Sequence, residues 1–190
     1  MTGTSILRDA KKAHSTFREV YGLVRYQEES IINTNLPTET KEFLSIAGMP
    51  ESAPPFLTFE PSSLGGGEIV INKYEIEDSK FDHLIYLGYT GSNDPICVSE
   101  INGEVVCLDY DNNFNSIFIN SSVNQFAESL IIYTKFINTI KEINGRQAYL
   151  EKNAPRESIS NLQIELKRVD ENSILENSFW KEEVESYNRD

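Results

Sequence analysis

Carboxylates are the most numerous groups in this sequence that could carry out chemistry. The 190 residues include 30 acidic and 17 basic side chains, which give a formal net charge of −13 at pH 7. Residues 51–111 contain 12 of the acidic residues but only two basic ones, Lys73 and Lys80, so this third of the chain has a charge of −10. General acid–base catalysis needs carboxylates with matched geometry and shifted pKa values. Charge density alone predicts an acidic surface, which either binds a partner or keeps the protein soluble.

One stretch of this acidic region has the spacing of oxygen ligands that a calcium-binding loop uses. Residues 109–115 read DYDNNFN, so that Asp, Asp, Asn and Asn occupy alternate positions. A calcium loop also needs a glycine at its sixth position, for a tight turn, and a glutamate at its twelfth, as a bidentate ligand. Here the sixth position is Phe114 and the twelfth is Asn120. We therefore predict a polar connection between two strands and no metal site.

The histidines and glycines offer few routes to catalysis or cofactor binding. His14 lies on an apolar stripe, and His83 follows Asp82 without a serine or cysteine nucleophile beside it. The glycine triplet at 65–67 is not followed by the Lys-Ser/Thr pair of a phosphate-binding loop, and no nucleophile elbow or dinucleotide fingerprint occurs. The sequence thus predicts a protein that is not an enzyme and that has no cofactor.

Helices are predicted on both sides of the acidic region. Apolar residues at steps of three and four, together with start and stop signals, indicate five helices, over residues 4–21, 37–47, 122–145, 155–169 and 179–187. The first has a stripe made of Ile6, Leu7, Ala10, Ala13, His14, Phe17, Val20, Tyr21 and Val24. The third begins with a capping box, Ser122 with Gln125, and ends at Gly145.

Short strands are predicted between the helices. Runs of β-forming residues alternate with Gly, Pro, Asn and Asp, and they cover residues 56–59, 68–71, 83–87, 96–101, 104–108 and 116–119. Most of their connections are too short for helical crossovers, which indicates an antiparallel meander. Residues 61–67, PSSLGGG, are predicted to be a flexible connection. The fold class is α+β, an antiparallel sheet of about six short strands flanked by N-terminal and C-terminal helices.

An Asn-Gly pair at 102–103 predicts the register of a β-hairpin. A two-residue type I′ turn at this pair places Cys97 opposite Leu108. Because side chains alternate along a strand, Cys97 and Cys107 then lie on opposite faces of the sheet. This register therefore excludes a disulfide between them.

Several short motifs occur in an order that resembles one group of proteins. Along the chain they are Leu36-Pro37, Phe43-Leu44, Gly48-Met49-Pro50, Leu87-Gly88, Asp94, Ile96-Cys97-Val98, Gly103-Glu104-Val105-Val106, Asn120-Ser121-Ser122-Val123 with Phe126, and Asp170 with Phe179-Trp180. Together they resemble the SUKH superfamily, and most of all its fourth immunity-protein subfamily. The resemblance covers residues 30–185 and implies one SUKH-like domain over 30–190, with residues 1–29 as an N-terminal helix outside the matched region. It also implies that these motifs determine the fold and are not an active site.

The same resemblance implies a function. Members of the subfamily are cytoplasmic bacterial immunity proteins, which bind a cognate polymorphic toxin and neutralise it by occlusion. Many such toxins are nucleases with basic clefts, to which an acidic surface is complementary. The contacts expected here are acidic residues in or beside predicted loops: Glu75, Glu77, Asp78, Asp82, Asp94, Asp109 and Asp111. The alternative is a non-enzymatic scaffold or regulatory module, like the fungal members of the superfamily.

Charge and hydropathy restrict the other partners. The acidic region repels phosphate backbones and anionic lipid surfaces, so we expect neither nucleic acid nor a membrane as a partner. No apolar run approaches the ~20 residues of a membrane span, and the N-terminal residues lack the apolar core of a signal peptide. A cytoplasmic protein is expected, either a monomer or a homodimer.

Overall fold

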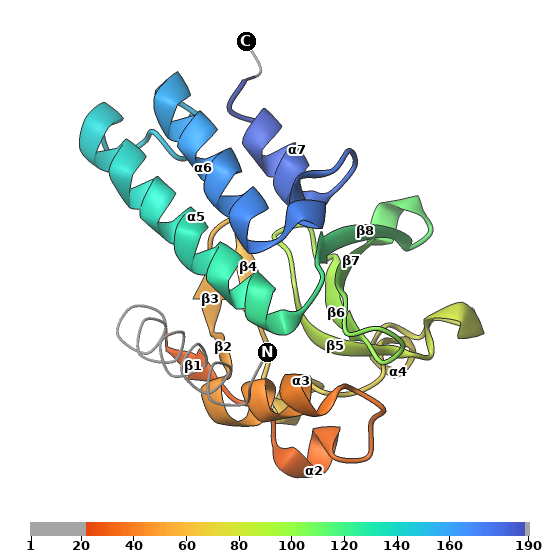
Figure 1. Cartoon of the computed structure of the whole chain (residues 1–190). Helices are drawn as coiled ribbons and strands as arrows, with labels where there is room; N and C mark the ends of the chain where they lie inside the picture. The colour runs from red at the N-terminus through yellow and green to blue at the C-terminus, as the bar shows by residue number, and fades with distance from the viewer. Residues whose placement is uncertain (1–21, 189–190) are drawn as a thin grey trace.

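The structure is a computed structural model that describes residues 22–188 of the chain (Figure 1). The helix predicted over residues 4–21 lies outside the described residues. The described chain begins with β1 (Leu23–Val24), α2 (Glu28–Ile31), α3 (Thr38–Glu42), a π-helical turn (Phe43–Ala47) and β2 (Met49–Pro50). Strands β1 and β2 pair with each other in a small antiparallel sheet.

Six short strands form the main sheet, and each pairs antiparallel with the next one along the chain. They are β3 (Ser52–Ala53), β4 (Leu57–Phe59), β5 (Leu84–Tyr89), β6 (Pro95–Ser99), β7 (Val105–Asp109) and β8 (Asn115–Asn120). A short helix, α4 (Val70–Tyr74), lies between β4 and β5 in the sequence. The predicted α+β class, with a six-stranded antiparallel meander, is confirmed.

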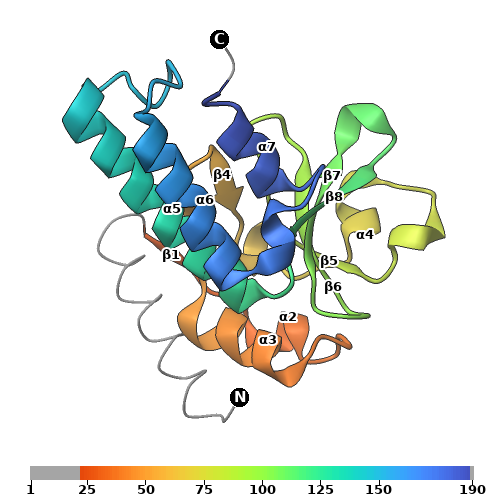
Figure 2. The ribbon, with the colours of Figure 1, turned by 45° about the horizontal axis from the view of Figure 1, so that its top comes forward.

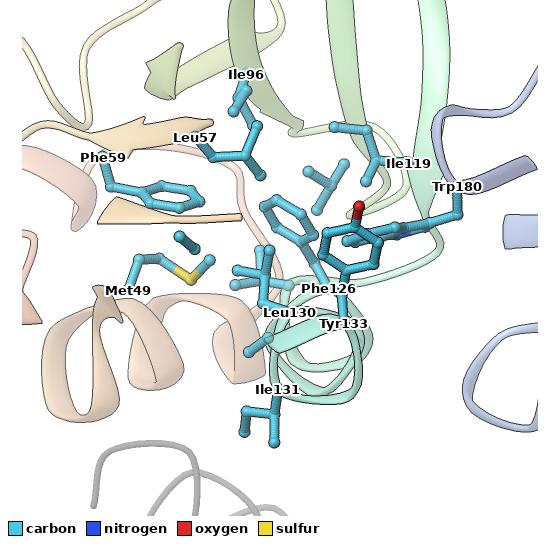
Figure 3. Packing of buried hydrophobic residues seen from close by; sticks show 14 of the residues in the cluster. Met49, Leu57, Phe59, Ile96, Ile119, Phe126, Leu130, Ile131, Tyr133 and Trp180 are labelled. Atoms are coloured by element: carbon cyan, nitrogen blue, oxygen red, sulfur yellow. The ribbon is translucent and has the colours of Figure 1, made fainter. Parts of the chain in front are cut away.

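Both faces of the sheet are covered, and β6 is buried along its whole length. On one face, Phe126 and Leu130 of the long helix α5 (Val123–Asn144) pack in the main core with Leu57 and Phe59 of β4 (Figure 3). On the other face, α4 and a 3-10 turn at Ser79–Phe81 cover a smaller apolar cluster. Figure 2 shows the strands between these two layers, with the C-terminal helices on one side and α4 on the other.

The three C-terminal helices follow the predictions. Ser122 caps α5, because its Oγ accepts a hydrogen bond from the backbone N–H of Gln125 at 3.3 Å, and Gly145 follows the last helical residue. Helix α6 (Arg156–Val169) packs beside α5. A 3-10 turn, η5 (Glu171–Ile174), then leads to α7 (Phe179–Glu185).

The prediction of a strand over residues 68–71 is wrong. Only Ile69 makes a β-bridge, to Ile85, and α4 begins at Val70. Strand β4 already occupies part of the same edge of β5, since it pairs with Gly88 and the residue after it. The β-branched run is therefore used to bury Val70 under the sheet and not to extend the sheet.

The connection over residues 61–67 is held more tightly than its composition predicts. Gly66 and Gly67 are buried. A Cβ at Gly66 would lie 1.9 Å from the carbonyl oxygen of Glu60, so no larger residue fits there. The N–H of Gly67 donates to the carbonyl of Tyr86 at 2.8 Å, which fixes the connection to β5.

The β6–β7 hairpin has a longer turn than predicted. The N–H of Ser99 donates to the carbonyl of Glu104 at 2.8 Å, so that residues 100–103 form a four-residue loop. A type I′ turn needs positive φ at both central residues, whereas only Gly103 has it here, at 79°. The predicted register is wrong by two residues, a shift that leaves every side chain on its predicted face. The two cysteines thus lie on opposite faces, and both are free.

Candidate partner-binding surface

The seven acidic residues predicted as partner contacts lie on or at the ends of three connections of the main sheet. They are Glu75, Glu77, Asp78 and Asp82 between α4 and β5, Asp94 between β5 and β6, and Asp109 and Asp111 at the β7–β8 connection. Asp94 and Asp109 are partly buried, and the other five are exposed. These seven residues are termed the acidic strip below.

Four residues of the acidic strip come together at one end of the sheet. One carboxylate oxygen of Asp94 accepts a hydrogen bond from the backbone N–H of Tyr110 at 3.0 Å. Asp109 and Asp111 flank Tyr110 in the chain, so Asp94, Asp109 and Asp111 all lie beside Tyr110. Glu75 lines the same surface hollow as Tyr110. Residues that are 36 positions apart in the sequence are thereby joined in one surface.

The rest of the acidic strip extends along the α4–β5 connection toward the other end of the strands. Asp82 lies just before Leu84, which pairs with Ser99 at the hairpin end of β6. The carboxylate of Asp78 contacts the ammonium of Lys80 at 3.1 Å and accepts from its backbone N–H at 3.0 Å. These hydrogen bonds lower the pKa of Asp78. The seven residues thus form an elongated surface and not a compact cluster.

A hollow of about 500 Å³ adjoins the four grouped acidic residues. It is lined by Glu60, Lys73, Tyr74, Glu75, Tyr86, Tyr89, Asn93 and Tyr110, and is termed the tyrosine depression below. Its walls come from α4, from β5 and from the turn after β7. Large, rigid aromatic side chains of this kind provide much contact area at a small entropic cost, as they do in binding surfaces generally.

A bulge in β5 makes the tyrosine depression possible. Tyr86 and Tyr89 are three positions apart and would face opposite sides of a regular strand. The pairing register of β5 shifts between Tyr86 and Gly88, so Leu87 is an extra residue. Leu87 is buried in the main core, whereas both tyrosines belong to the cluster on the other face.

The positive charge within the tyrosine depression is already paired. The ammonium of Lys73 lies 2.9 Å from a carboxylate oxygen of Glu60, and the hydroxyl of Tyr86 donates to the same oxygen at 2.9 Å. Burial raises the pKa of Tyr74 to about 12 and that of Tyr86 further, so both phenols stay protonated at neutral pH. The charge around the hollow that is not paired within it is therefore negative, and it comes from the carboxylates of the acidic strip.

The tyrosines were not among the residues that the sequence predicted for this surface. Four of the nine tyrosines of the chain, Tyr74, Tyr86, Tyr89 and Tyr110, fall within residues 74–110, among the acidic residues. This local density is the signal that could have identified them. The common orientation of Tyr86 and Tyr89 depends on the bulge in β5, so a regular alternation of side chains does not predict it.

The stretch at 109–115 acts as a polar connection in the structure. A carboxylate oxygen of Asp109 accepts from the backbone N–H of Asn112 at 3.2 Å, and Phe114 packs edge-on against Tyr110 at a centroid distance of 5.3 Å. Within residues 22–188, no three His, Cys, Asp or Glu side chains are grouped in a way that could hold a metal ion.

Several motifs that carry the resemblance meet in one buried network on the opposite face of the sheet. The indole N–H of Trp180 donates to the side-chain oxygen of Asn120 at 2.9 Å. The amide nitrogen of Asn120 donates to Asp170 at 3.2 Å and to Ser129 at 3.3 Å. Asp170 also accepts from the backbone N–H and the hydroxyl of Ser121. The network joins β8, α5, η5 and α7, so these motifs hold the fold together.

The two cysteines have the environment of structural thiols. Burial raises the pKa of Cys97, which is fully enclosed in the smaller cluster, and also that of Cys107 in the main core. A thiol whose pKa is raised stays protonated at neutral pH and is a poor nucleophile.

The architecture and the position of its buried motifs are those expected of a SUKH-type immunity protein. The family model described as SUKH-4 immunity protein matches residues 8–186, and the chain belongs to this family. No curated protein and no solved structure matches the chain. In the part of the chain that the structure describes, no helix has the length and apolar character needed to cross a membrane.

Proposed function

We propose that this protein binds a cognate bacterial toxin through the acidic strip and the tyrosine depression, and that it neutralises the toxin by covering its functional site. The observation that carries the proposal is the combination of carboxylates with one exposed aromatic ring, Tyr110, and two partly exposed rings, Tyr74 and Tyr89, at one end of the sheet. Tyr110 is 51% exposed, and the carboxylates of Glu75, Asp109 and Asp111 are near it in space or sequence.

This chemistry fits a basic partner surface. Arginine and lysine side chains stack over aromatic rings and form charge-assisted hydrogen bonds with carboxylates. A nuclease-type toxin has such residues in the cleft that holds the phosphate backbone of its substrate. The acidic strip would compete with phosphate for them, and the negative field would accelerate association in the cytoplasm. Occlusion of this kind needs no catalytic group in the immunity protein.

Co-expression with the toxin encoded beside this gene tests the proposal. We expect the protein to restore growth and to co-purify with the toxin. The triple variant Glu75→Lys, Glu77→Lys, Asp111→Lys should weaken binding by about a hundredfold or more, because it places like charges at the interface. The matched control Glu142→Lys, Glu151→Lys, Glu157→Lys changes the charge equally on exposed residues of the C-terminal helical layer.

The outcomes distinguish a failure of the proposed function from a failure of the proposed binding surface. A wild-type protein that neither restores growth nor co-purifies with the toxin would end the proposal. Equal loss of binding in the triple variant and in its control would leave the function standing and remove the acidic strip as the site. Capture of host signalling or wall-synthesis proteins, without a toxin, would indicate the scaffold or regulatory module instead.

A further inference from the structure

A second hollow lies between the helices on the other side of the sheet. It is a groove of about 640 Å³ along α5 and α6, to which α3 and the π-helical turn also contribute. It is termed the helical groove below. Its apolar lining residues are Phe43, Ile131, Ile132, Phe136, Leu162 and Val169, and its charged ones are Glu39, Glu128, Lys135, Glu165 and Arg168. An apolar floor between charged rims is the surface that an amphipathic helix covers.

We propose that residues 4–21 of the same chain form a helix that occupies the helical groove. The apolar residues of this segment, among them Leu7, Phe17 and Tyr21, recur at helical spacing on one side. On the same helical projection Lys12 and Glu19 fall on the opposite side. A single helix of this length is marginal in water unless its apolar side is buried. The groove offers an apolar surface of matching character.

The chain enters the described structure close to the helical groove. Strand β1 pairs with β2, which begins two residues after the π-helical turn that carries Phe43. In Figure 1, β1 lies below α5 and to the left of α3. A helix over residues 4–21 is about 27 Å long, and only Gly22 separates it from Leu23 of β1. The segment is therefore tethered beside the groove, where its effective concentration is high.

Charge also favours this occupant. Residues 1–21 contain four basic and two acidic residues, whereas the remainder of the chain contains 13 basic and 28 acidic residues. A segment with a charge of +2 is therefore attached to a body with a charge of −15 and is attracted to it. At the groove, Arg168 is already paired with Glu128 at 3.0 Å and with Glu165 at 3.1 Å. Among the described residues, Glu39 and Lys135 are the charged groups of the rim without an ion pair, so the attraction comes from the charge of the whole body.

The family match supports an occupant from this chain. The match begins at residue 8, so residues 8–21 belong to the part of the chain that the family shares. If a second copy or a foreign protein filled the groove, this apolar stripe would need another surface to cover it.

Hydrogen exchange of the full-length protein tests the proposal. We expect the backbone amides of residues 4–21 to exchange about tenfold or more slowly than those of a synthetic peptide with the sequence 1–21. Phe17→Asp and Ile132→Asp change the two sides of the proposed contact, and each should abolish this protection while β5 and β6 remain protected. The control Lys12→Ser lies on the polar side of the predicted helix and should keep the protection.

Three results would overturn the proposal. The first is an unprotected segment in the wild type, and the second is protection that survives either aspartate substitution in a folded protein. The third is protection that is lost on dilution together with a dimer in sedimentation, which would place a second copy in the groove. If Ile132→Asp does not fold, the milder variant Ile132→Ser takes its place, because Phe17→Asp changes only the segment and does not test where the segment docks.

Discussion

Trp180 links the last helix to the rest of the molecule through both packing and a hydrogen bond. Its side chain is fully buried in the main core beside Tyr133, with the ring centroids 5.5 Å apart. Its N–H satisfies the oxygen of Asn120, which is also fully buried. A buried amide without its partner is costly, since it has lost its hydrogen bonds to water. A single residue therefore supports apolar contacts and the polar network at once.

Replacement of Trp180 by phenylalanine should lower the free energy of unfolding by about 3 kcal/mol. The change leaves a cavity and also removes the donor to Asn120. Urea denaturation followed by circular dichroism would measure the loss. Ile164→Ala, at an exposed position of α6, is the control and should change the stability by only about 0.5 kcal/mol. A loss of similar size in both variants would argue against the special role of Trp180.

At the scale of the element, α5 is the centre of the main core and its N-terminal cap is made by local residues. The hydroxyl of Ser122 donates to the side-chain oxygen of Gln125 at 2.8 Å, and its oxygen accepts from the backbone N–H of the same residue. The amide group of Gln125 reaches on to the carbonyl of Val169 at the end of α6. The cap of one helix is thereby joined to the last turn of another.

Substitution of Ser122 by alanine should destabilise the protein by about 1 kcal/mol. The loss is expected because one N–H of the first turn of α5 no longer has an acceptor. Thermal unfolding would register it as a drop of a few degrees in Tm. Ser160→Ala, at an exposed interior position of α6, should be neutral or slightly stabilising. An unchanged Tm in Ser122→Ala would show that water replaces the cap without cost.

The helices could be predicted from the sequence because their signals are local. The cap at Ser122 and the stop at Gly145 each depend on a few neighbouring residues, and the structure confirms both. The strand predicted over 68–71 failed because the pairing of β4 with β5 decides what the run at Ile69 can do. The hairpin register failed because an Asn-Gly pair also fits a four-residue loop.

The candidate surface was predictable only in part. The acidic residues could be found from charge density, and the structure places all seven at connections of the main sheet. The tyrosine depression depends on the extra residue Leu87 in β5 and on the approach of Tyr74 to Tyr110, whose ring centroids are 6.4 Å apart. Neither feature has a local signal in the sequence.

At the scale of the whole molecule, tyrosine hydroxyls are enclosed on both faces of the sheet. Burial is the main cause of a raised pKa in Tyr26, Tyr74, Tyr86, Tyr133, Tyr149 and Tyr187. In the unfolded chain a tyrosine ionises near pH 10. Above this pH the folded protein therefore holds more protons than the unfolded chain does.

The free energy of unfolding should consequently fall as the pH rises from about 10. The slope is roughly 1.4 kcal/mol per pH unit for each tyrosine that ionises only in the unfolded state. Urea midpoints measured at several values between about pH 8 and 12 would show this decline. Tyr74→Phe removes one such group and should make the slope shallower between pH 10 and about 12, the pKa of Tyr74. A midpoint that is constant over this range would contradict the enclosure of these hydroxyls.

The pairing of each strand with the next one along the chain has a consequence for biosynthesis. Neighbours of this kind meet soon after they are made, so the sheet can assemble while the chain is still growing. The main core depends instead on residues that are far apart in the sequence. Asn120 can form its hydrogen bond only after Trp180, 60 residues later, has been made, and Tyr133 only after Glu183, 50 residues later. A nascent chain that ends before α7 carries a sheet with an incompletely covered apolar face. Translation of α7, and not formation of the sheet, is therefore the step that completes the main core.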